Sequence, residues 1–445
     1  MPIHRSQGTT RTEKLLAALC ERSFLKLWSY PNPVNQDRKE FCDLLAVFDN
    51  HVFIFFDREN GQLLDNGNDP EVSWARWKRK VLDPQIRTAN GAERYLRKGG
   101  KVFLDSKLEQ PFPIPIDTTT MIVHKIIAVH GAEDACLSAS ERNVSGSLAI
   151  WYASAEIPFP NQPFTVFIDK EQPVHVLDSC TLPIILGELD TFYDFLAYLT
   201  AKNETIQRFD FLAYCGEEDL LCNYFHNFDD EQDRHFIGTK EAGVNGLFVA
   251  EGGWRDFLAS DAYKRKKESD RVSYFWDALI QKTCQNALAG TLRGDPNVFG
   301  RSSAIREMAK EPRFIRRALS EAMIFSIEHF PESDESMTRN VTYHSSFFPD
   351  KAYVFLQLRL RETRDYENYY RPRRQKLLVI ACGAAKIIHP ELNTIVGIAM
   401  DAPKFSRTNS EDFVLMNCSK WNGEDVEYYR KENEPFRFFG TGACQ

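Results

Sequence analysis

The chain has 445 residues, of which 43% are hydrophobic and 27% charged, values typical of globular rather than disordered or fibrous proteins. Its net charge of −8 argues against a general nucleic-acid coat, but it leaves room for a local basic groove. No apolar run approaches the roughly 20 residues that a membrane span needs, and the first residues lack a signal-peptide core. We therefore expect a cytoplasmic protein without a membrane partner.

The length exceeds what one hydrophobic core usually supports, so two or three domains are expected. The acidic stretch 229–233 and the glycine-containing region 243–253 indicate a boundary. We place a first domain at 1–240 and a second α/β domain at 241–445. Helical and strand patterns mix along the whole chain, which predicts a mixed α/β (α+β) fold class.

The expected elements of the first half begin with an amphipathic helix at 11–28 that Thr12 could cap, and it ends at the prolines of 30–33. Two apolar strands joined by a tight turn follow at 41–48 and 52–57, and then a long helix or helix pair at 72–98. The remaining predictions are strands at 101–104 and 121–129, a hairpin of 165–169 with 174–178, and helix over 182–225.

In the second half of the chain, the hydrophobic pattern predicts an alternation of helices and strands. The expected helices are 254–290, 303–330 and 371–388, and the expected strands are 353–360, 394–400 and 412–418.

The ten cysteines form no C-x-x-C pair, which disfavours structural zinc and thioredoxin-type chemistry. Cys215, Cys222 and His226 would converge if 211–226 were helical. No fourth ligand is evident, and core residues under an amphipathic helix are the simpler interpretation.

Three motifs of the first hundred residues carry a family resemblance. Glu21 lies in CERSFLKLWSY of the first helix, Asp43 opens CDLLAVF of the next strand, and Gln85 lies in PQIRTANGAE of the following helix. In this order they resemble the PD-(D/E)XK restriction-endonuclease-like nucleases of the Mrr and NERD branches. The resemblance implies a three-layer α/β/α core and phosphodiester hydrolysis with Mg²⁺ or Mn²⁺, for which Glu21 and Asp43 could supply metal-binding oxygens.

The chain departs from that family at its acid-x-Lys triplet. Phe56 occupies the acid position and Arg58 the lysine position, with Asp57 between them. Because strand side chains alternate, Asp57 and Arg58 face opposite sides, and Phe56 should be buried on the face opposite Phe55. Arg58 can hold a phosphate but cannot act as a base. The candidate catalytic set is therefore Glu21, Asp43, Asp57, Arg58 and Gln85, and its incompleteness favours an inactive site.

A basic segment follows the second strand. Its candidate nucleic-acid-binding residues are Lys78, Lys80, Arg87, Arg94, Arg97 and Lys101, most of them spaced to form one stripe along a helix. Such a stripe would bind the phosphates of DNA or RNA in a salt-dependent, sequence-independent way. A solvated face without a ligand is an equally good interpretation, whereas Trp74 and Trp77 are typical core residues.

The second half matches no motif known to us. An arginine cluster at 361–374 with interleaved tyrosines would suit phosphates and bases, or it would be a charged loop. Asp401 and Asp412 flank the last two strands and faintly resemble a second metal site. We expect this domain to serve in recognition, homo-oligomer formation or docking of a protein partner.

Two functions from different classes remain. The resemblance implies a divergent or degenerate metal-dependent nuclease-like protein that binds or acts on nucleic acid, in defence or DNA processing. The alternative is a non-enzymatic α/β interaction scaffold without a nucleic-acid role, which the acidic net charge favours.

Overall fold

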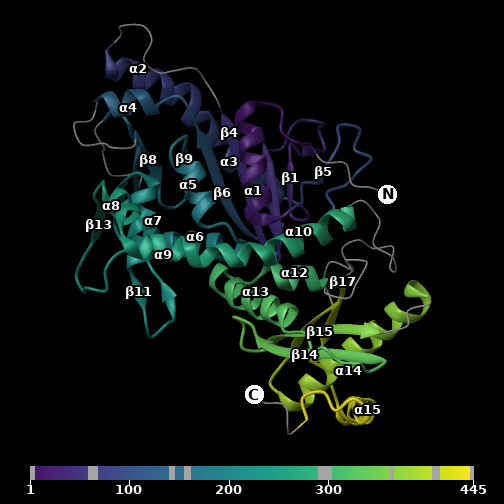
Figure 1. Cartoon of the computed structure of the whole chain (residues 1–445). Helices are drawn as coiled ribbons and strands as arrows, with labels where there is room; N and C mark the ends of the chain where they lie inside the picture. The colour runs from purple at the N-terminus through teal and green to yellow at the C-terminus, as the bar shows by residue number, and fades with distance from the viewer. Residues whose placement is uncertain are drawn as a thin grey trace. The chain divides into compact units, whose positions relative to one another are not determined.

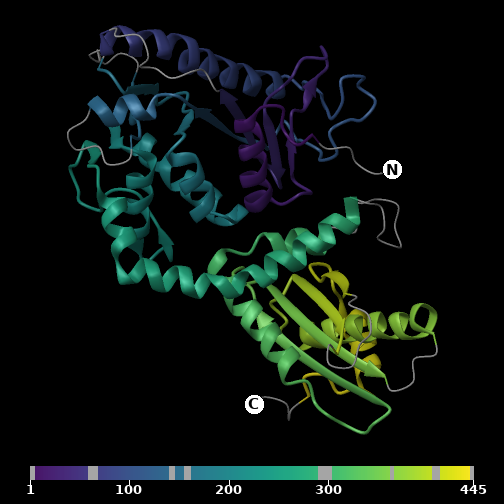
Figure 2. The ribbon, with the colours of Figure 1, turned by 45° about the horizontal axis from the view of Figure 1, so that its top comes forward.

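The computed structural model describes residues 6–58, 69–139, 146–154, 162–288, 303–360, 365–402 and 411–440. The chain forms two compact units, residues 1–266 and residues 267–445, which Figures 1 and 2 show in two views. Helices and several mixed sheets confirm the predicted mixed α/β class. No helix in these ranges is long and apolar enough to cross a membrane.

Unit 1 contains a five-stranded sheet in the order β1-β3-β4-β6-β9. Its strands are β1 (Ser29–Pro31), β3 (Leu44–Phe48), β4 (His51–Arg58), β6 (Ile122–Val129) and β9 (His175–Asp178). The first three pair antiparallel, whereas β4, β6 and β9 are parallel. The carboxyl ends of three strands therefore meet at one edge.

Helices cover both faces of this sheet. On one face α1 (Arg11–Phe24) sets the Phe24 ring 5.1 Å from that of Phe53, and Phe53 stacks on His124. On the other, Lys125 bonds Asn90 of α3 (Asp83–Arg97), which continues α2 (Pro70–Trp77) and the π-helical turn η1 (Lys78–Leu82). The helix pair expected at 72–98 is thus present, whereas α1 is capped by Thr10 rather than Thr12.

A second sheet of unit 1 has the order β13-β10-β7-β8. Its strands are β7 (Ala149–Ala153), β8 (Thr165–Asp169), β10 (Phe211–Cys215) and β13 (Gly246–Val249). The helices nearby are α4 (Glu133–Ala139), α5 (Thr181–Glu188), α6 (Phe192–Arg208), α7 (Glu217–His226) and α8 (Gly253–Ala259). The short strands β2 (Val34–Asn35) and β5 (Val102–Phe103) form one small pair, and β11 (Phe228–Asp229) and β12 (Arg234–His235) form another.

Two predictions for this region were wrong. The segments 165–169 and 174–178 form no hairpin, because β8 pairs with β7 while β9 joins β6 in the other sheet. The stretch 182–225 is not continuous helix, since β10 separates α6 from α7. Unit 1 also extends past the expected boundary at residue 240, because β13 pairs with β10 and completes the sheet.

Unit 2 is built on the sheet β14-β15-β16-β17, whose long strands run side by side in Figure 2. The strands are β14 (Met337–Ser345), β15 (Lys351–Leu360), β16 (Thr394–Asp401) and β17 (Glu411–Asn417). The helix α9 (Asp261–Asp270) crosses the division between the units, and η2 (Arg271–Ser273), α10 (Tyr274–Leu288), α12 (Ser303–Ala309), α13 (Arg313–Glu328), η3 (Tyr366–Tyr370), α14 (Arg371–Ile388) and α15 (Gly423–Asn433) complete the unit.

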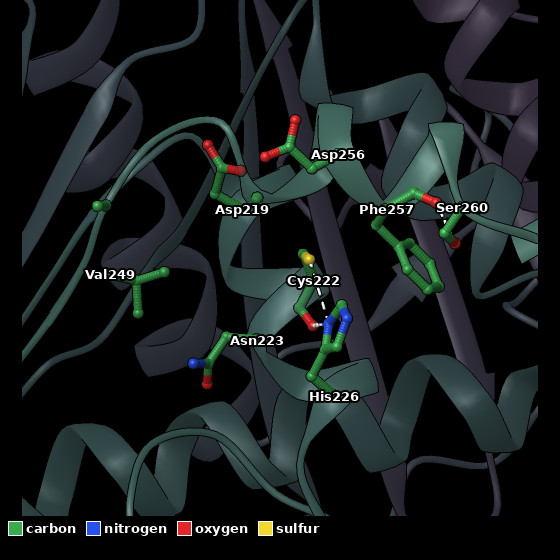
Figure 3. A pocket seen from close by; sticks show the side chains of 10 residues that line it. Asp219, Cys222, Asn223, His226, Val249, Asp256, Phe257 and Ser260 are labelled. Carbon is green, nitrogen blue, oxygen red and sulfur yellow. Dashed lines mark hydrogen bonds between the residues drawn. The ribbon is translucent and has the colours of Figure 1, made fainter. Parts of the chain in front are cut away.

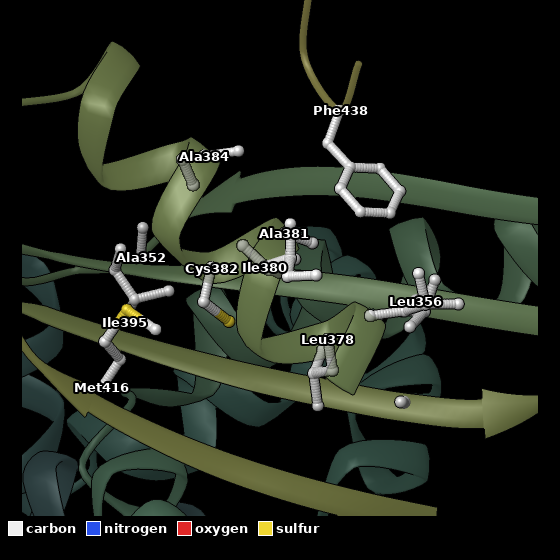
Figure 4. Close-up of a cluster of buried hydrophobic side chains, with 14 of the residues drawn as sticks. Ala352, Leu356, Leu378, Ile380, Ala381, Cys382, Ala384, Ile395, Met416 and Phe438 are labelled. Atoms are coloured by element: carbon white, nitrogen blue, oxygen red, sulfur yellow. The ribbon is translucent and has the colours of Figure 1, made fainter. Parts of the chain in front are cut away.

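The core of unit 2 lies between α14 and the sheet. Figure 4 shows Leu378 and Cys382 of α14 facing Leu356 and Ile395 of the central strands. On the opposite face, Trp276 of α10 packs its ring edge-on against Tyr353, 5.2 Å away. The helix 371–388 and the strands around 353, 394 and 412 were predicted, whereas the polar edge strand β14 was missed, since edge strands lack a strong apolar pattern.

Candidate functional site at the carboxyl edge of the first sheet

Three polar side chains stand in a row where the parallel strands of unit 1 end. Asp57 is the penultimate residue of β4, His130 follows β6, and Ser179 follows β9. Pairing of Asp57 with Ala128 and of Val129 with Asp178 puts the three residues on one face, because side chains alternate along each strand. Ligands of open parallel sheets bind at this edge as a rule, which makes the row a candidate site.

Hydrogen bonds join the three residues. His130 Nε2 lies 2.8 Å from Asp57 Oδ1, and His130 Nδ1 lies 2.7 Å from Ser179 Oγ. The Asp57 side chain is 0% exposed, and among the described residues its second oxygen, Oδ2, has no hydrogen-bond partner. A buried carboxylate oxygen without a partner costs free energy, and such groups concentrate at functional sites.

Asp43 joins this row from the neighbouring strand. Its Oδ2 accepts the backbone N–H of Asp57 at 2.7 Å. Burial raises the pKa of the Asp43 carboxyl to about 7. The negative charges of Glu40, Glu13 and Asp57 also raise this pKa, whereas the hydrogen bond from the Asp57 N–H lowers it. In the described part of the chain no lysine or arginine forms an ion pair with Asp43 or Asp57. Strongly perturbed carboxyls of this kind are typical of functional sites.

Two turns hold His130 and Ser179 in place. After His130 the chain turns at Gly131, whose φ of 91° favours glycine, and the Gly131 N–H donates to Glu133 Oε2. After β9, the buried Asp178 accepts the N–H groups of Cys180 and Thr181 through Oδ1, both at 2.9 Å. Asp178 thereby fixes the strand-to-helix turn that carries Ser179.

The basic helical segment is anchored over the same edge. The indole N–H of Trp77 donates to the carbonyl of His130 at 3.1 Å, and Gln85 donates to the carbonyl of Ala128 at 3.4 Å. Trp77 and Gln85 are buried, whereas Lys80 and Arg87 are exposed. The sequence therefore places solvent-facing cations on a helix whose buried face is bonded to the strand ends.

The structure brings together only part of the predicted catalytic set. Asp43 bonds the backbone of Asp57, and Gln85 reaches the same strand ends, where its Oε1 has no partner in the part of the chain that the structure describes. Glu21 pairs instead with Lys26 at 2.9 Å. Along α1 it lies eight residues, or about 12 Å, beyond Glu13, whose charge acts on Asp43. Arg58 is exposed at the end of β4. Phe56 is buried, as expected, at 7% exposure.

The predicted basic stripe is partly neutralised. Lys78 pairs with Asp83 at 3.0 Å and Arg97 with Glu93 at 2.8 Å. The remaining predicted members are exposed to solvent, namely Lys80, Arg87, Arg94 and Lys101. Of these, Lys80, Arg87 and Arg94 follow one another at intervals of seven residues along η1 and α3, so one face of the helical segment stays basic.

A divalent metal ion does not fit the row as it stands. The described residues contain no group of three or more His, Cys, Asp or Glu side chains that could hold a metal. Mg²⁺ keeps several waters and needs open space around its ligands, whereas the Asp57 carboxylate is enclosed. The predicted Glu21–Asp43 metal pair thus stays a prediction, and no chemical step below is derived through a metal.

A separate hollow of about 450 Å³ lies in unit 1 beside α7 and α8 (Figure 3). Cys222 Sγ lies there 3.3 Å from His226 Nδ1. Burial raises the pKa of the Cys222 thiol to about 11, and the nearby Asp219 and Asp256 charges add to the shift. The thiol is therefore protonated and weakly nucleophilic at neutral pH. Cys215 lies on β10 rather than on a helix, so the condition for its convergence with Cys222 and His226, a helical segment 211–226, is not met.

Comparison with known proteins returned no match to any family model, curated protein or solved structure. The site therefore rests on its own geometry. Sequence reasoning missed His130 and Ser179, although each directly follows an apolar strand that was predicted. A polar residue immediately after such a strand was the available signal.

Proposed function

We propose that unit 1 binds the phosphodiester backbone of nucleic acid across the basic segment 78–101 and presents it to the carboxyl edge of β4, β6 and β9. The observation that carries this proposal is the bond from Trp77 to the carbonyl of His130, which ties the basic helical segment to the polar row. Phosphate binding needs a run of exposed cations, and Lys80, Arg87 and Arg94 provide one.

The order of elements supports a nuclease-like assignment. A first helix, three antiparallel strands and a helical crossover precede a strand parallel to β4. Asp43, an acidic position of the resemblance, accepts the backbone N–H of Asp57 at the end of β4. Phe56 and Arg58 still replace the acid and lysine of the family motif. We therefore expect the protein to bind nucleic acid, whereas cleavage with Mg²⁺ should be slow or absent.

The test is a gel-shift titration of labelled single- and double-stranded DNA and RNA at rising salt, with and without Mg²⁺. The triple variant K80A/R87A/R94A should weaken binding and lower the slope of log K against log salt by about 2 to 3, since each lost phosphate contact removes about 0.9.

The matched control, R255A/K264A/R265A, removes three exposed cations from α8 and α9 of the same unit. It should leave both affinity and slope nearly unchanged. Equal losses in the two triple variants would show that only overall charge matters. Absence of any shift at low salt would favour the interaction scaffold.

A further inference from the structure

The hydrogen-bonded row of unit 1 has a direction. Its buried end is Asp57, whose side chain is 0% exposed, and its middle is His130, whose side chain is 9% exposed. Its outer end is Ser179, which is partly exposed on the turn between β9 and α5. The imidazole uses one ring nitrogen toward the acid and the other toward the hydroxyl.

We propose that Ser179 is a nucleophile activated by His130, with Asp57 as the positioning residue that orients the imidazole. In this arrangement a buried acid fixes the ring, the ring accepts the hydroxyl proton, and the hydroxyl belongs to a partly exposed residue. His130 Nδ1 receives the proton here, because Nε2 is the nitrogen bonded to Asp57. Recognition of such a group depends on geometry and roles rather than on sequence position.

The substrate class is a phosphodiester, and this assignment rests on the proposed nucleic-acid binding. Ser179 Oγ attacks phosphorus while its proton passes to His130, the phosphorus bond to the leaving oxygen breaks, and that oxygen takes the proton. Water then attacks the phosphoserine diester and frees Ser179. The sum is addition of water across one phosphorus–oxygen bond, with no redox partner.

A fluorophosphonate probe tests the nucleophile without any nucleic acid. Attack by Ser179 forms an oxygen–phosphorus bond and releases fluoride, which leaves a mass increase on the peptide that contains residue 179. Wild-type protein should be labelled there and S179A should not. H130Q should slow labelling by about 100-fold or more, because a positioned general base contributes at least that much. D57N should slow it similarly.

The matched control is S138A, which changes another serine of unit 1, an exposed one whose hydroxyl bonds the Asp134 carbonyl. It should be labelled at residue 179 like the wild type. S179A deletes one hydroxyl from a partly exposed turn, so its unfolding midpoint should match that of the wild type and confirm an intact fold.

The outcomes separate this inference from the proposed function. No label at residue 179, or labelling that H130Q leaves unchanged, would overturn the nucleophile even if nucleic acid still binds. Labelling that depends on His130 in a protein that binds no nucleic acid would support the nucleophile and overturn the phosphodiester substrate.

Discussion

Aspartates lie at the ends of comparable strands in both units, but the groups that bond them differ. Both sheets contain a central parallel pair, β4 with β6 and β15 with β16. In unit 2, Asp401 ends β16 and Asp412 lies at the start of β17, and the fully buried Arg374 bonds both carboxylates. In unit 1, Asp43 accepts the backbone N–H of Asp57, and the Asp57 carboxylate bonds His130.

The difference separates a structural cluster from a candidate site. Arg374 Nη2 lies 2.6 Å from Asp412 Oδ2, and Tyr366 donates to Asp401 at 2.8 Å. Every charge of that cluster has a partner of opposite sign, so the faint resemblance of Asp401 and Asp412 to a metal site is explained by an ion-pair network. Of the arginine cluster at 361–374, Arg361 and Arg364 lie outside the described residues, and Arg371 also bonds Asp412. At the edge of the first sheet, by contrast, Asp57 Oδ2 has no hydrogen-bond partner among the residues that the structure describes.

Removal of the arginine should produce the largest effect. R374M removes the buried guanidinium that pairs with both Asp401 and Asp412, while Asp412 keeps its pair with Arg371. Breaking a buried ion pair from one side costs about 3 to 5 kcal/mol. Hydrogen exchange of the β16 and β17 amides would measure this loss for unit 2 alone. The control R373M changes the exposed neighbouring arginine and should cost less than about 0.5 kcal/mol. Similar losses in both variants would contradict the structural role of Arg374.

The same Asp-to-Asn change should have opposite signs at the two edges. D412N weakens the bonds to Arg374 and should destabilise unit 2 by about 1 to 3 kcal/mol. The pKa of Asp43 is raised to about 7 from an ordinary 3.8, so its unfavourable ionisation lowers stability as the pH rises through this window. D43N should therefore stabilise unit 1 at pH 8.5, by about 2 kcal/mol, and much less at pH 5.

Urea unfolding of D43N and wild type at both pH values measures this effect. A wild-type unfolding free energy that stays constant from pH 5 to pH 8.5, or a D43N variant that follows the wild type in parallel, would mean that the Asp43 carboxyl ionises normally. The outcome of D412N provides the internal reference, because its partner arginine keeps the same charge throughout this range.

The sequence could predict the helices and strands of both units better than it could predict which strands pair with one another. Alternation along β4 correctly separates Asp57 from Arg58, but the resemblance places the site on the Arg58 side, and the polar row lies on the Asp57 side. His130 and Ser179 meet Asp57 only because β4, β6 and β9 pair in parallel across long stretches of chain. Such pairing depends on long-range packing that no local pattern encodes, and the same cause explains the wrong hairpin at 165–178.

The smallest expected effect concerns the charges around Asp43. Glu40 raises the pKa of Asp43 by like-charge repulsion, and its carboxylate also accepts a hydrogen bond from Asn32 at 2.7 Å. E40Q keeps an oxygen for Asn32 and removes the charge, so it should stabilise unit 1 by a few tenths of a kcal/mol at pH 8.5. In unit 2, E411Q removes the partner of Lys282 beside Asp412 and should destabilise by a similar amount. Both effects should fade in 1 M salt, where the screening length falls to about 3 Å. Stabilisation by both substitutions would mean that excess negative charge acts alike on the two edges, and the contrast between an open and a neutralised edge would then fail.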